Sequence, residues 1–345
     1  MKPTIAIIIP CRNEEGYIYN CINSILNSNY PKDKYDIYVC DGLSDDRTRT
    51  IIDELSLNHK NVHLIDNIKR TTPYALNLGI RSSKADIKII LGAHAEIAHD
   101  FLENNTLLLN EHLDAQCVGG IIDNVYEDRN SMIIGMAMSS SFGVGNAHFR
   151  TGNKEGYVDT VAFGAYRSGV FDKVGYFDED LTRNQDDEFN YRLIKNGMKI
   201  YLSSKIKSKY FVRGTFTKLI KQYYQYGYWK VYVNKKHSTI TTIRQLIPFL
   251  FLSFVFLLAF QLIDCFFMGL ISPFINTISV IILALYFILG FYFAFKKTGI
   301  NKDVFLVFYT FLLLHLGYGY GYFSGLIDFI IFNKTPKSSS TLLTR

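Results

Sequence analysis

Three long stretches without a charged residue occupy the last third of the chain and most constrain its fold. Between Gln245 and Phe332 only six charged residues occur, and they leave residues 245–263, 265–295 and 304–327 uncharged. A helix needs about 20 apolar residues to cross roughly 30 Å of hydrocarbon. The pattern therefore predicts a multi-pass membrane region at residues 246–332, with helices at 246–263, 274–295 and 304–323 and a tail at 333–345.

The positive charge is concentrated just before this region. From Phe189 to Ile263 there are thirteen Lys and Arg residues and no Asp or Glu. We interpret residues 216–245 as a basic amphipathic neck at the membrane surface, because cationic and aromatic side chains gather at anionic lipid headgroups. Aromatic residues beside cations also bind nucleic acid. A predicted membrane helix follows at once, so we expect membrane lipids as the partner and no nucleic acid.

Basic residues beside the predicted helices indicate their orientation. Lys235, Lys236 and Arg244 lie before the first helix, whereas the 264–273 loop has neither Lys nor Arg. The positive-inside rule then places the N-terminal domain in the cytoplasm and the chain in the inner, or plasma, membrane. With three crossings the basic tail lies outside, in mild conflict with that rule. Five cysteines without Cys-x-x-Cys spacing indicate reduced thiols.

The first 215 residues have the pattern of an α/β domain. Apolar runs at Ile5–Pro10, Tyr35–Cys40, Val62–Ile65 and Ile87–Leu91 predict strands, and helical spacing predicts helices at Glu14–Leu26, Thr48–Leu57 and Thr72–Arg81. This alternation is typical of a parallel sheet, whose ligands bind at the carboxyl ends of the strands. After about residue 115 the chain turns to short segments rich in Gly and Ser.

Polar side chains follow three of the predicted strands. They are Arg12, Asn13 and Glu14 after the first, Asp41, Ser44 and Asp46 after the second, and His94 and Glu96 after the fourth. A carboxylate here can accept a ring N–H from a nucleobase, and helix N-termini can bind phosphate oxygens. Residues 41–48 would equally suit a tight turn followed by a helix cap.

Three motifs carry a family resemblance. Ile7-x-Ile9-Pro10-x-x-Asn13-Glu14, the Asp-Gly-x-Ser-x-Asp-x-Thr run at 41–48 and Ala-Leu-Asn-x-Gly-Ile at 75–80 resemble the family 2 glycosyltransferases. Within that family the chain resembles the membrane-anchored enzymes of bacterial exopolysaccharide assembly, of the succinoglycan type. The resemblance covers residues 4–235. It implies a nucleotide-sugar-binding, Rossmann-like mixed sheet of the A type (GT-A) and an inverting hexosyl transfer from a nucleotide diphosphate donor, commonly a UDP-sugar.

The resemblance also implies roles for individual residues. It assigns Asp41 to the base, Pro10 and Glu14 to the wall of the nucleoside site, and Arg12, Ser44 and Asp46 to the same nucleotide-binding set. The family's metal-binding Asp-x-Asp falls at Gly92-Ala93-His94. We predict His94 as a metal ligand, with Glu96 or a donor phosphate completing the shell. An imidazole favours Mn²⁺ over Mg²⁺. The alternative is that metal binding has been lost.

Inverting transfer needs one carboxylate to take the proton of the acceptor hydroxyl. The family's Glu-Asp motif falls at Gln185-Asp186, so we predict Asp186 as the base, with Asp187 as the competitor. The other interpretation of this segment is an acidic, capped helix start. Candidates for the donor sugar and the acceptor are Gly164 and Ala165 in a small-residue strand, Gln185, and Gln222 and Trp229 in a segment that loosely resembles Gln-x-x-Arg-Trp.

These features predict a membrane enzyme that adds one sugar to a lipid-linked saccharide during exopolysaccharide, capsule or cell-surface glycan assembly. Three predicted helices are few for a polysaccharide channel, which favours single addition. The alternatives are a processive polysaccharide synthase and a catalytically silent, membrane-bound nucleotide-sugar binder. The substitutions at Gly92 and His94 motivate the second alternative.

Overall fold

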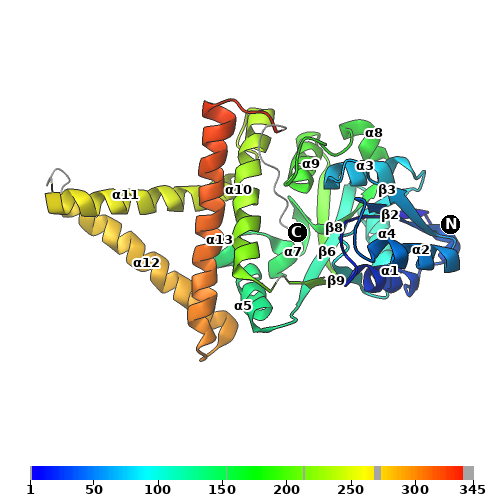
Figure 1. The fold of residues 1–345 in the computed structure, drawn as a ribbon, viewed down its shortest axis with the longest axis horizontal. Helices are drawn as coiled ribbons and strands as arrows, with labels where there is room; N and C mark the ends of the chain where they lie inside the picture. Colours follow the sequence, from blue (N-terminus) through cyan, green and yellow to red (C-terminus); the bar gives the residue numbers. More distant parts are fainter. Residues whose placement is uncertain (1, 153, 213, 268–272, 337–345) are drawn as a thin grey trace. The chain divides into compact units, whose positions relative to one another are not determined.

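The structure is a computed structural model that describes residues 2–152, 154–212, 214–267 and 273–336. The chain forms two compact units (Figure 1). The first unit contains the residues up to Val125 together with Ala147–Phe211, and the second contains Tyr126–Asn146 together with the residues from Val212 onward. The first unit thus ends close to the predicted boundary at residue 215, but residues 126–146 leave it and pack with the C-terminal helices.

A single mixed sheet organises the first unit. Among the described residues its strands are β1 (Ile5–Cys11), β2 (Tyr35–Asp41), β3 (Val62–Asp66), β4 (Ile87–Ile90), β5 (Ala95–Ile97), β6 (Ala115–Val125), β7 (Gly156–Val158), β8 (Ala162–Arg167) and β9 (Lys199–Phe211). Their order is β3-β2-β1-β4-β8-β6-β9-β5, with β7 paired to β9. The first four strands are mutually parallel, as predicted, and β8 runs antiparallel to β4.

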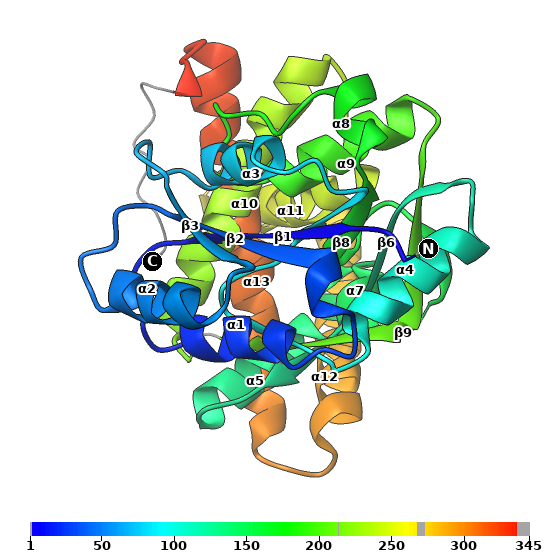
Figure 2. The same cartoon turned by 90° about the vertical axis from the view of Figure 1, so that its right-hand side faces the viewer.

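Helices cover both faces of this sheet (Figure 2). On one face lie α1 (Ile18–Leu26), α2 (Thr48–Asn58) and α4 (Phe101–Glu111), and on the other α3 (Thr72–Arg81), α8 (Gly169–Val174) and α9 (Gln185–Lys195). Alternate side chains of β1 point to opposite faces. Ile7 joins the core with Ile22 of α1, and Ile8 joins the core with Leu76 of α3. A strand buried on both faces explains the continuous apolar run at the N-terminus. The short segments η1 (Lys32–Lys34) and α7 (His148–Thr151) complete this unit.

The second unit is helical. It comprises α5 (Arg129–Met138), α6 (Ser141–Val144), α10 (Phe216–His237), η2 (Ile243–Leu246), α11 (Ile247–Phe267), α12 (Pro273–Thr298), α13 (Asp303–Gly325) and the π-helical η3 (Leu326–Ile331). Among the described residues three helices are long and apolar enough to cross a membrane, at Ile243–Asp264, Phe274–Thr298 and Asp303–Ile331. Their number and positions agree with the prediction. Residues 268–272 of the predicted outer loop and residues 337–345 of the tail lie outside the described residues.

Glycines allow α10 and α13 to pack closely along their length. A Cβ at Gly321 of α13 would lie 1.9 Å from the carbonyl oxygen of Tyr224, and one at Gly227 of α10 would lie 2.0 Å from that of Tyr318. Neither backbone could approach so closely with a larger residue. Residues 216–237 of the segment predicted as a surface neck therefore form a helix, one side of which is buried against α13.

Polar contacts tie residues 126–146 to the C-terminal helices. Arg129 Nη2 of α5 donates to Asp303 Oδ1 at the start of α13, 2.6 Å away. Nε2 of His315 lies 2.8 Å from the carbonyl oxygen of Phe142, and Nδ1 of the same ring lies 2.8 Å from the hydroxyl of Tyr286. These contacts show why this internal segment belongs to the helical unit.

Candidate functional site

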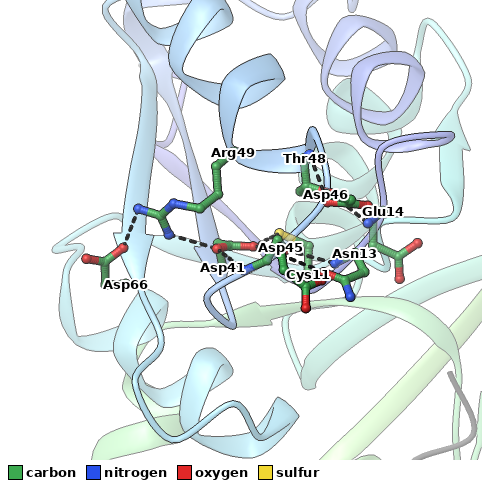
Figure 3. A network of polar contacts seen from close by, with 10 residues as sticks. Cys11, Asn13, Glu14, Asp41, Asp45, Asp46, Thr48, Arg49 and Asp66 are labelled. Atoms are coloured by element: carbon green, nitrogen blue, oxygen red, sulfur yellow. Dashed lines mark hydrogen bonds and ion pairs between the residues drawn. The ribbon is translucent and has the colours of Figure 1, made fainter.

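The loops after β1 and β2 are joined by hydrogen bonds (Figure 3). The backbone N–H of Asn13 donates to Ser44 Oγ at 2.8 Å, and that of Asp45 donates to Asn13 Oδ1 at 3.1 Å. Asn13 has a left-handed φ of 55°, which Asn tolerates better than most residues and which lets the chain turn sharply after β1. The two predicted nucleotide loops therefore form one rigid edge at the carboxyl ends of adjacent parallel strands.

Asp41, the last residue of β2, is fully buried beneath these loops. Its Oδ2 accepts from the backbone N–H of Ser44 at 2.9 Å and from Arg49 Nη1 at 2.8 Å. Its Oδ1 accepts from the Ser44 hydroxyl and, at 3.7 Å, from the Cys11 thiol. A carboxylate offers about four acceptor positions. A nucleobase N–H at Asp41 must therefore share or replace one of these bonds.

Arg49 and Asp66 belong to this site, and the sequence motifs did not include them. Arg49 lies in the first turn of α2, and its Nη2 donates to Asp66 Oδ1 at 2.8 Å. Asp66 ends β3 directly opposite Asp41. Hydrogen bonds to Asp41 and then to Asp66 raise the pKa of Arg49. The sequence signal that could have found them was an acidic residue at the end of both β2 and β3, with an Arg in the first turn of the helix between these strands.

The side chain of Asp46 links the loops after β1 and β2 by hydrogen bonds. Its Oδ1 accepts from the backbone N–H of Thr48 at 2.9 Å and its Oδ2 accepts from that of Glu15 at 3.2 Å. Partial burial raises the pKa of Asp46, but the hydrogen bonds from Thr48 and Glu15 outweigh burial and lower it overall. Asp46 thus stays charged and holds the loop at the start of α2.

The remaining residues of the nucleotide set frame the same edge. Pro10 lies near the end of β1, and the Arg12 side chain packs on Gly42, where a Cβ would lie 3.2 Å from Arg12 Cβ. The backbone N–H of Glu14 donates to Thr48 Oγ1 at 2.7 Å. All predicted nucleotide residues therefore lie in two interlocked loops. Contact of each with a nucleotide stays a prediction.

His94, in the loop after β4, meets the loop after β1. Its Nδ1 lies 3.0 Å from Oε2 of Glu14, a residue only 3% exposed, and its ring stacks on Tyr17 with centroids 4.4 Å apart. A carboxylate beside Nδ1 favours the tautomer that carries its proton there. The lone pair is then on Nε2, as in many metal-binding histidines.

Glu96 is placed differently from His94. It lies in β5, and its Oε2 accepts from Lys209 Nζ at 3.3 Å. Within the described ranges no group of three His, Cys, Asp or Glu side chains is placed to hold a metal. The arrangement therefore offers one well-oriented nitrogen ligand, and a donor diphosphate would have to complete a metal shell.

Gly92 occupies the position of the first Asp of the family's metal motif. A Cβ there would lie 3.3 Å from Cε1 of Phe163, whose φ of 48° is unusual for an aromatic residue. The Phe163 ring thus fills the space that a side chain at position 92 would need.

Asp186 lies in the first turn of α9, after Asn184 in the left-handed conformation (φ 61°). Asp186 is exposed, and its Oδ1 accepts from the backbone N–H of Asp187 at 2.9 Å. Although the residue is exposed, neighbouring atoms displace part of the water around its carboxyl group. This loss, followed by the negative charge of Asp187, raises the pKa of Asp186. Register favours Asp186 over Asp187 as the base, and the choice between the two stays a prediction.

Buried contacts hold α9 in place. Glu188 has no exposed surface and accepts from Arg192 Nε at 2.8 Å and Nη2 at 2.9 Å. Arg192 also donates to the carbonyl oxygen of Tyr176 at 2.7 Å. The segment around Tyr176 is therefore a support for the helix that carries Asp186.

Gly164 and Ala165 are buried in β8. A Cβ at Gly164 would lie 2.9 Å from Cys117 Sγ, so tight packing already requires the small residue. The side-chain oxygen of Gln185 is buried and has no hydrogen-bond partner within the described residues. In the second unit, Gln222 is 5% exposed and donates to the Tyr226 hydroxyl at 2.7 Å, and Trp229 is 3% exposed. Their contact with donor or acceptor stays a prediction.

The cysteine prediction holds where it can be examined. Cys11, Cys21, Cys40 and Cys117 are buried and form no disulfide within the described part of the chain. Burial raises the pKa of Cys21 and of Cys40 to about 12, so both are thiols at neutral pH. The side chain of Cys265 lies outside the described residues.

Comparison with known proteins identifies the family. Residues 6–175 match the model of "Glycosyl transferase family 2". A Methanococcus voltae protein, named dolichyl N-acetyl-alpha-D-glucosaminyl phosphate 3-beta-D-2,3-diacetamido-2,3-dideoxy-beta-D-glucuronosyltransferase, is 38% identical over 231 residues, which cover 65% of this chain and 71% of that protein. The succinoglycan biosynthesis protein ExoA of Rhizobium meliloti is 29% identical over 246 residues, 70% of this chain and 73% of that protein.

A solved structure supports the fold. The mannosyltransferase PcManGT from Pyrobaculum calidifontis, in complex with GDP-Man and Mn²⁺, aligns over 94% of this chain and 88% of its own with a TM-score of 0.58 and 16% identity. The chain belongs to glycosyltransferase family 2. Its first unit is a mixed α/β sheet domain of the GT-A type, and the resemblance to exopolysaccharide enzymes is confirmed. The family match ends at residue 175, before Asp186.

Proposed function

We propose that this glycosyltransferase moves one sugar, with inversion, from a nucleotide diphosphate donor to a lipid-linked saccharide in the assembly of an exopolysaccharide, capsule or cell-surface glycan. The interlocked loops around Asp41, with the Glu14–His94 pair beside them, carry the proposal because they form a rigid polar edge at the strand ends. The names of the two relatives, which refer to a dolichyl phosphate sugar and to succinoglycan, support this acceptor class. The catalytic unit would work at the cytoplasmic face of the plasma membrane.

The nucleobase would be bound by Asp41 and Arg49 together. Asp41 can accept a ring N–H, and Arg49 can donate to the carbonyl oxygen beside it. Uracil and guanine both carry this N–H and C=O pair, whereas adenine does not. We place UDP-sugars first, and GDP-sugars second because a structural neighbour holds GDP-Man. Pro10, Arg12 and Glu14 would line the nucleoside, and Ser44 and Asp46 would keep Asp41 and its loop in place.

A divalent metal fits His94 better than it fits Glu96. Glu14 fixes the ring of His94 through Nδ1, so that Nε2 would hold the ion. Nitrogen ligation favours Mn²⁺ over Mg²⁺. When bound, the ion would neutralise the charge of the leaving diphosphate. The substitution of Asp by His then modifies the family's metal site and does not abolish it.

Asp186 would act as the base. Its raised pKa makes it a stronger proton acceptor than an ordinary aspartate. It would take the proton of the acceptor hydroxyl while that oxygen bonds to the anomeric carbon and the bond to the diphosphate breaks on the opposite face. The buried side-chain oxygen of Gln185 suits a sugar hydroxyl as its missing donor. Gly164 and Ala165 would shape the donor-sugar side, and Gln222 and Trp229 the acceptor side.

The experiment is to incubate membranes containing the protein with a panel of radiolabelled nucleotide sugars and to extract the lipid fraction. We expect one donor to label the lipid fraction, and the label to disappear in Asp186→Asn, which should still bind the donor. A wild-type protein that binds the donor but neither transfers nor hydrolyses it would be the silent binder instead. Products that lengthen with time would indicate the processive synthase.

A further inference from the structure

Helix α13 differs from the other two apolar helices in how much of it the protein itself covers. Half of its most apolar stretch is buried within the structure, against 11% for the first apolar helix and 17% for the second. Phe311 and Leu314 of α13 have no exposed surface at all. A helix in this position is a core element of the second unit, and its apolar residues are explained by protein packing as well as by lipid.

The neighbour that covers α13 is the basic helix α10. The two helices run parallel and in register: Phe216 packs on Tyr309 at their starts, and Gly321 and Gly325 lie against the backbone of Tyr224 and Tyr228 further along. Because they lie side by side over their length, α13 can cross a bilayer only if α10 crosses with it.

Helix α10 is poorly suited to cross a bilayer. It carries Lys218 and Lys221 near its start, Lys230 past its middle, and Lys235 and Lys236 near its end. A lysine near the bilayer centre costs roughly 2.5–3.5 kcal/mol on insertion scales. A basic helix rich in aromatic residues is instead typical of the membrane surface.

The distribution of tyrosine separates α10 and α13 from α11, whereas α12 carries Tyr286 and Tyr292. Tyrosines lie at positions 223, 224, 226, 228 and 232 of α10 and at 309, 318, 320 and 322 of α13, whereas α11 has neither Tyr nor Trp. Tyr and Trp prefer the boundary between lipid and water. The composition of α10 and α13 therefore matches the interface, and that of α11 matches hydrocarbon.

Helices α11 and α12 leave this pair as a hairpin (Figure 1). Helix α11 crosses α13 near its own start, where a Cβ at Gly319 would lie 2.4 Å from the carbonyl oxygen of Pro248. Helix α12 returns to α13 where Phe291 stacks on Phe308, with ring centroids 4.2 Å apart. Between these crossings large apolar side chains are exposed, among them Phe260 at 51%, Leu262 at 62% and Phe274 at 71%. The 21 residues of α11 reach roughly 31 Å, enough to cross the hydrocarbon.

We propose that only the α11–α12 hairpin crosses the membrane and that α10 and α13 lie together in the plane of its cytoplasmic surface. Both ends of the hairpin are then on one side. Lys296 and Lys297 in the last turn of the hairpin, Lys302 just after it and Lys334 after α13 all face the cytoplasm, as the positive-inside rule requires. Three crossings would place Lys334 outside. The surface arrangement thus places the basic tail in the cytoplasm and removes its conflict with the positive-inside rule.

The first test measures depth with spin labels on the full-length chain in liposomes, with Cys265 replaced by Ser. Labels are attached singly to Phe305→Cys and Tyr320→Cys, exposed positions fifteen residues apart on α13. We expect them to lie at nearly equal depth. A crossing helix would separate them by about 22 Å along the membrane normal, and that result would overturn the proposal.

The matched control uses α11. Ile247→Cys and Leu262→Cys are also fifteen residues apart, and both positions are 62% exposed. If α11 crosses, their depths differ by up to about 22 Å. Equal depths for this pair would show that the hairpin lies on the surface too, which would equally overturn the proposal.

The second test locates the chain end in sealed vesicles of known orientation. A single cysteine in the tail, Ser340→Cys, is treated with a membrane-impermeant maleimide and compared with Asn301→Cys, in the turn between α12 and α13. We expect both to react from the same side, and Ser272→Cys in the hairpin loop to react from the other. If the tail position and the hairpin-loop position are labelled from the same side, the chain crosses the membrane three times and the proposal is wrong.

Discussion

Asp41 shows how one carboxylate can organise a site without being exposed. Its bond to Arg49 is the one most open to solvent, because the Arg49 side chain is 33% exposed. We expect Arg49→Gln to weaken binding of the donor nucleotide roughly tenfold, about 1.4 kcal/mol, because a charged hydrogen bond next to the base is lost. The thermal midpoint should also fall, since buried Asp41 loses its counter-charge.

Calorimetric titration with UDP and GDP would measure this change. Asp66→Asn is the control, because it preserves the bond between Arg49 and Asp41 while removing only the exposed negative charge at position 66. If Arg49→Gln left the nucleotide affinity unchanged, Arg49 would not contact the base. The proposed transfer reaction would not be affected by that result.

The raised pKa of Asp186 predicts a pH dependence. The base must be ionised, so kcat should fall as the pH drops through that pKa, at a higher pH than for an ordinary aspartate. Asp187→Asn removes the second cause of the shift, and its acid limb should move to lower pH while turnover persists. Asp186→Asn should lose transfer and keep donor binding. If Asp187→Asn were the inactive variant, the two roles would be exchanged.

A substitution of Glu14 should change the affinity for the metal, although Glu14 would not itself bind the ion. In Glu14→Gln the amide oxygen can still accept from Nδ1 of His94, but the ring loses a charged partner and becomes a weaker ligand. Such partners typically change metal affinity by 10–100-fold. Titration with Mn²⁺ in the presence of UDP, followed by the electron paramagnetic resonance of free Mn²⁺, would measure it. Glu96→Gln should change little, and an equal effect in both variants would argue against His94 as the ligand.

The sequence motifs identified the acidic and hydroxyl side chains of the candidate site, but they did not identify Arg49, which binds Asp41. Asp41, Ser44 and Glu14 stood out because polar residues directly follow apolar strands. Arg49 did not, because an Arg in the first turn of an ordinary helix is usually a surface residue. Its role depends on Asp41 and Asp66, which only strand pairing brings together.

Helices and strands of the first unit were largely predictable because their apolar periodicity is local. The expected helix Thr72–Arg81 has the bounds of α3. Helix α1 begins at Ile18 and not at Glu14, because residues 14–17 form a turn in which the Glu14 carbonyl accepts from Tyr17 and Ile18. The environment of α10 was not predictable, since its burial depends on glycines about a hundred residues away in α13.

The fit of α10 against α13 predicts a difference between two glycines of the same helix. Gly321→Ala would place a Cβ 1.9 Å from the Tyr224 carbonyl oxygen, so the helices must move apart. Gly317→Ala meets Ile220 at 3.4 Å, an ordinary contact. We expect Gly321→Ala to lower the thermal midpoint of the detergent-solubilised protein clearly and Gly317→Ala to leave it nearly unchanged. Equal midpoints would mean that the two helices are not closely packed.

The number of crossing helices bears on the product. A hairpin of two helices leaves no room within one chain for a polysaccharide channel, so we expect single addition. Mass spectrometry of the lipid-linked product should show one added sugar even at large donor excess. A ladder of longer products would favour the processive alternative and would require a channel built from several chains or from another protein.

The internal segment 126–146 has a consequence for biosynthesis. Helix α5 is complete when the ribosome has made residue 138, but α13, with the Asp303 that pairs with Arg129, follows more than 160 residues later. At roughly 5–20 residues per second, Ile133, Ile134 and Met138, which are buried in the finished protein, wait of the order of ten seconds or more for their partner. In a protein truncated after the catalytic sheet these apolar side chains would stay exposed, and we expect it to aggregate in the expression host.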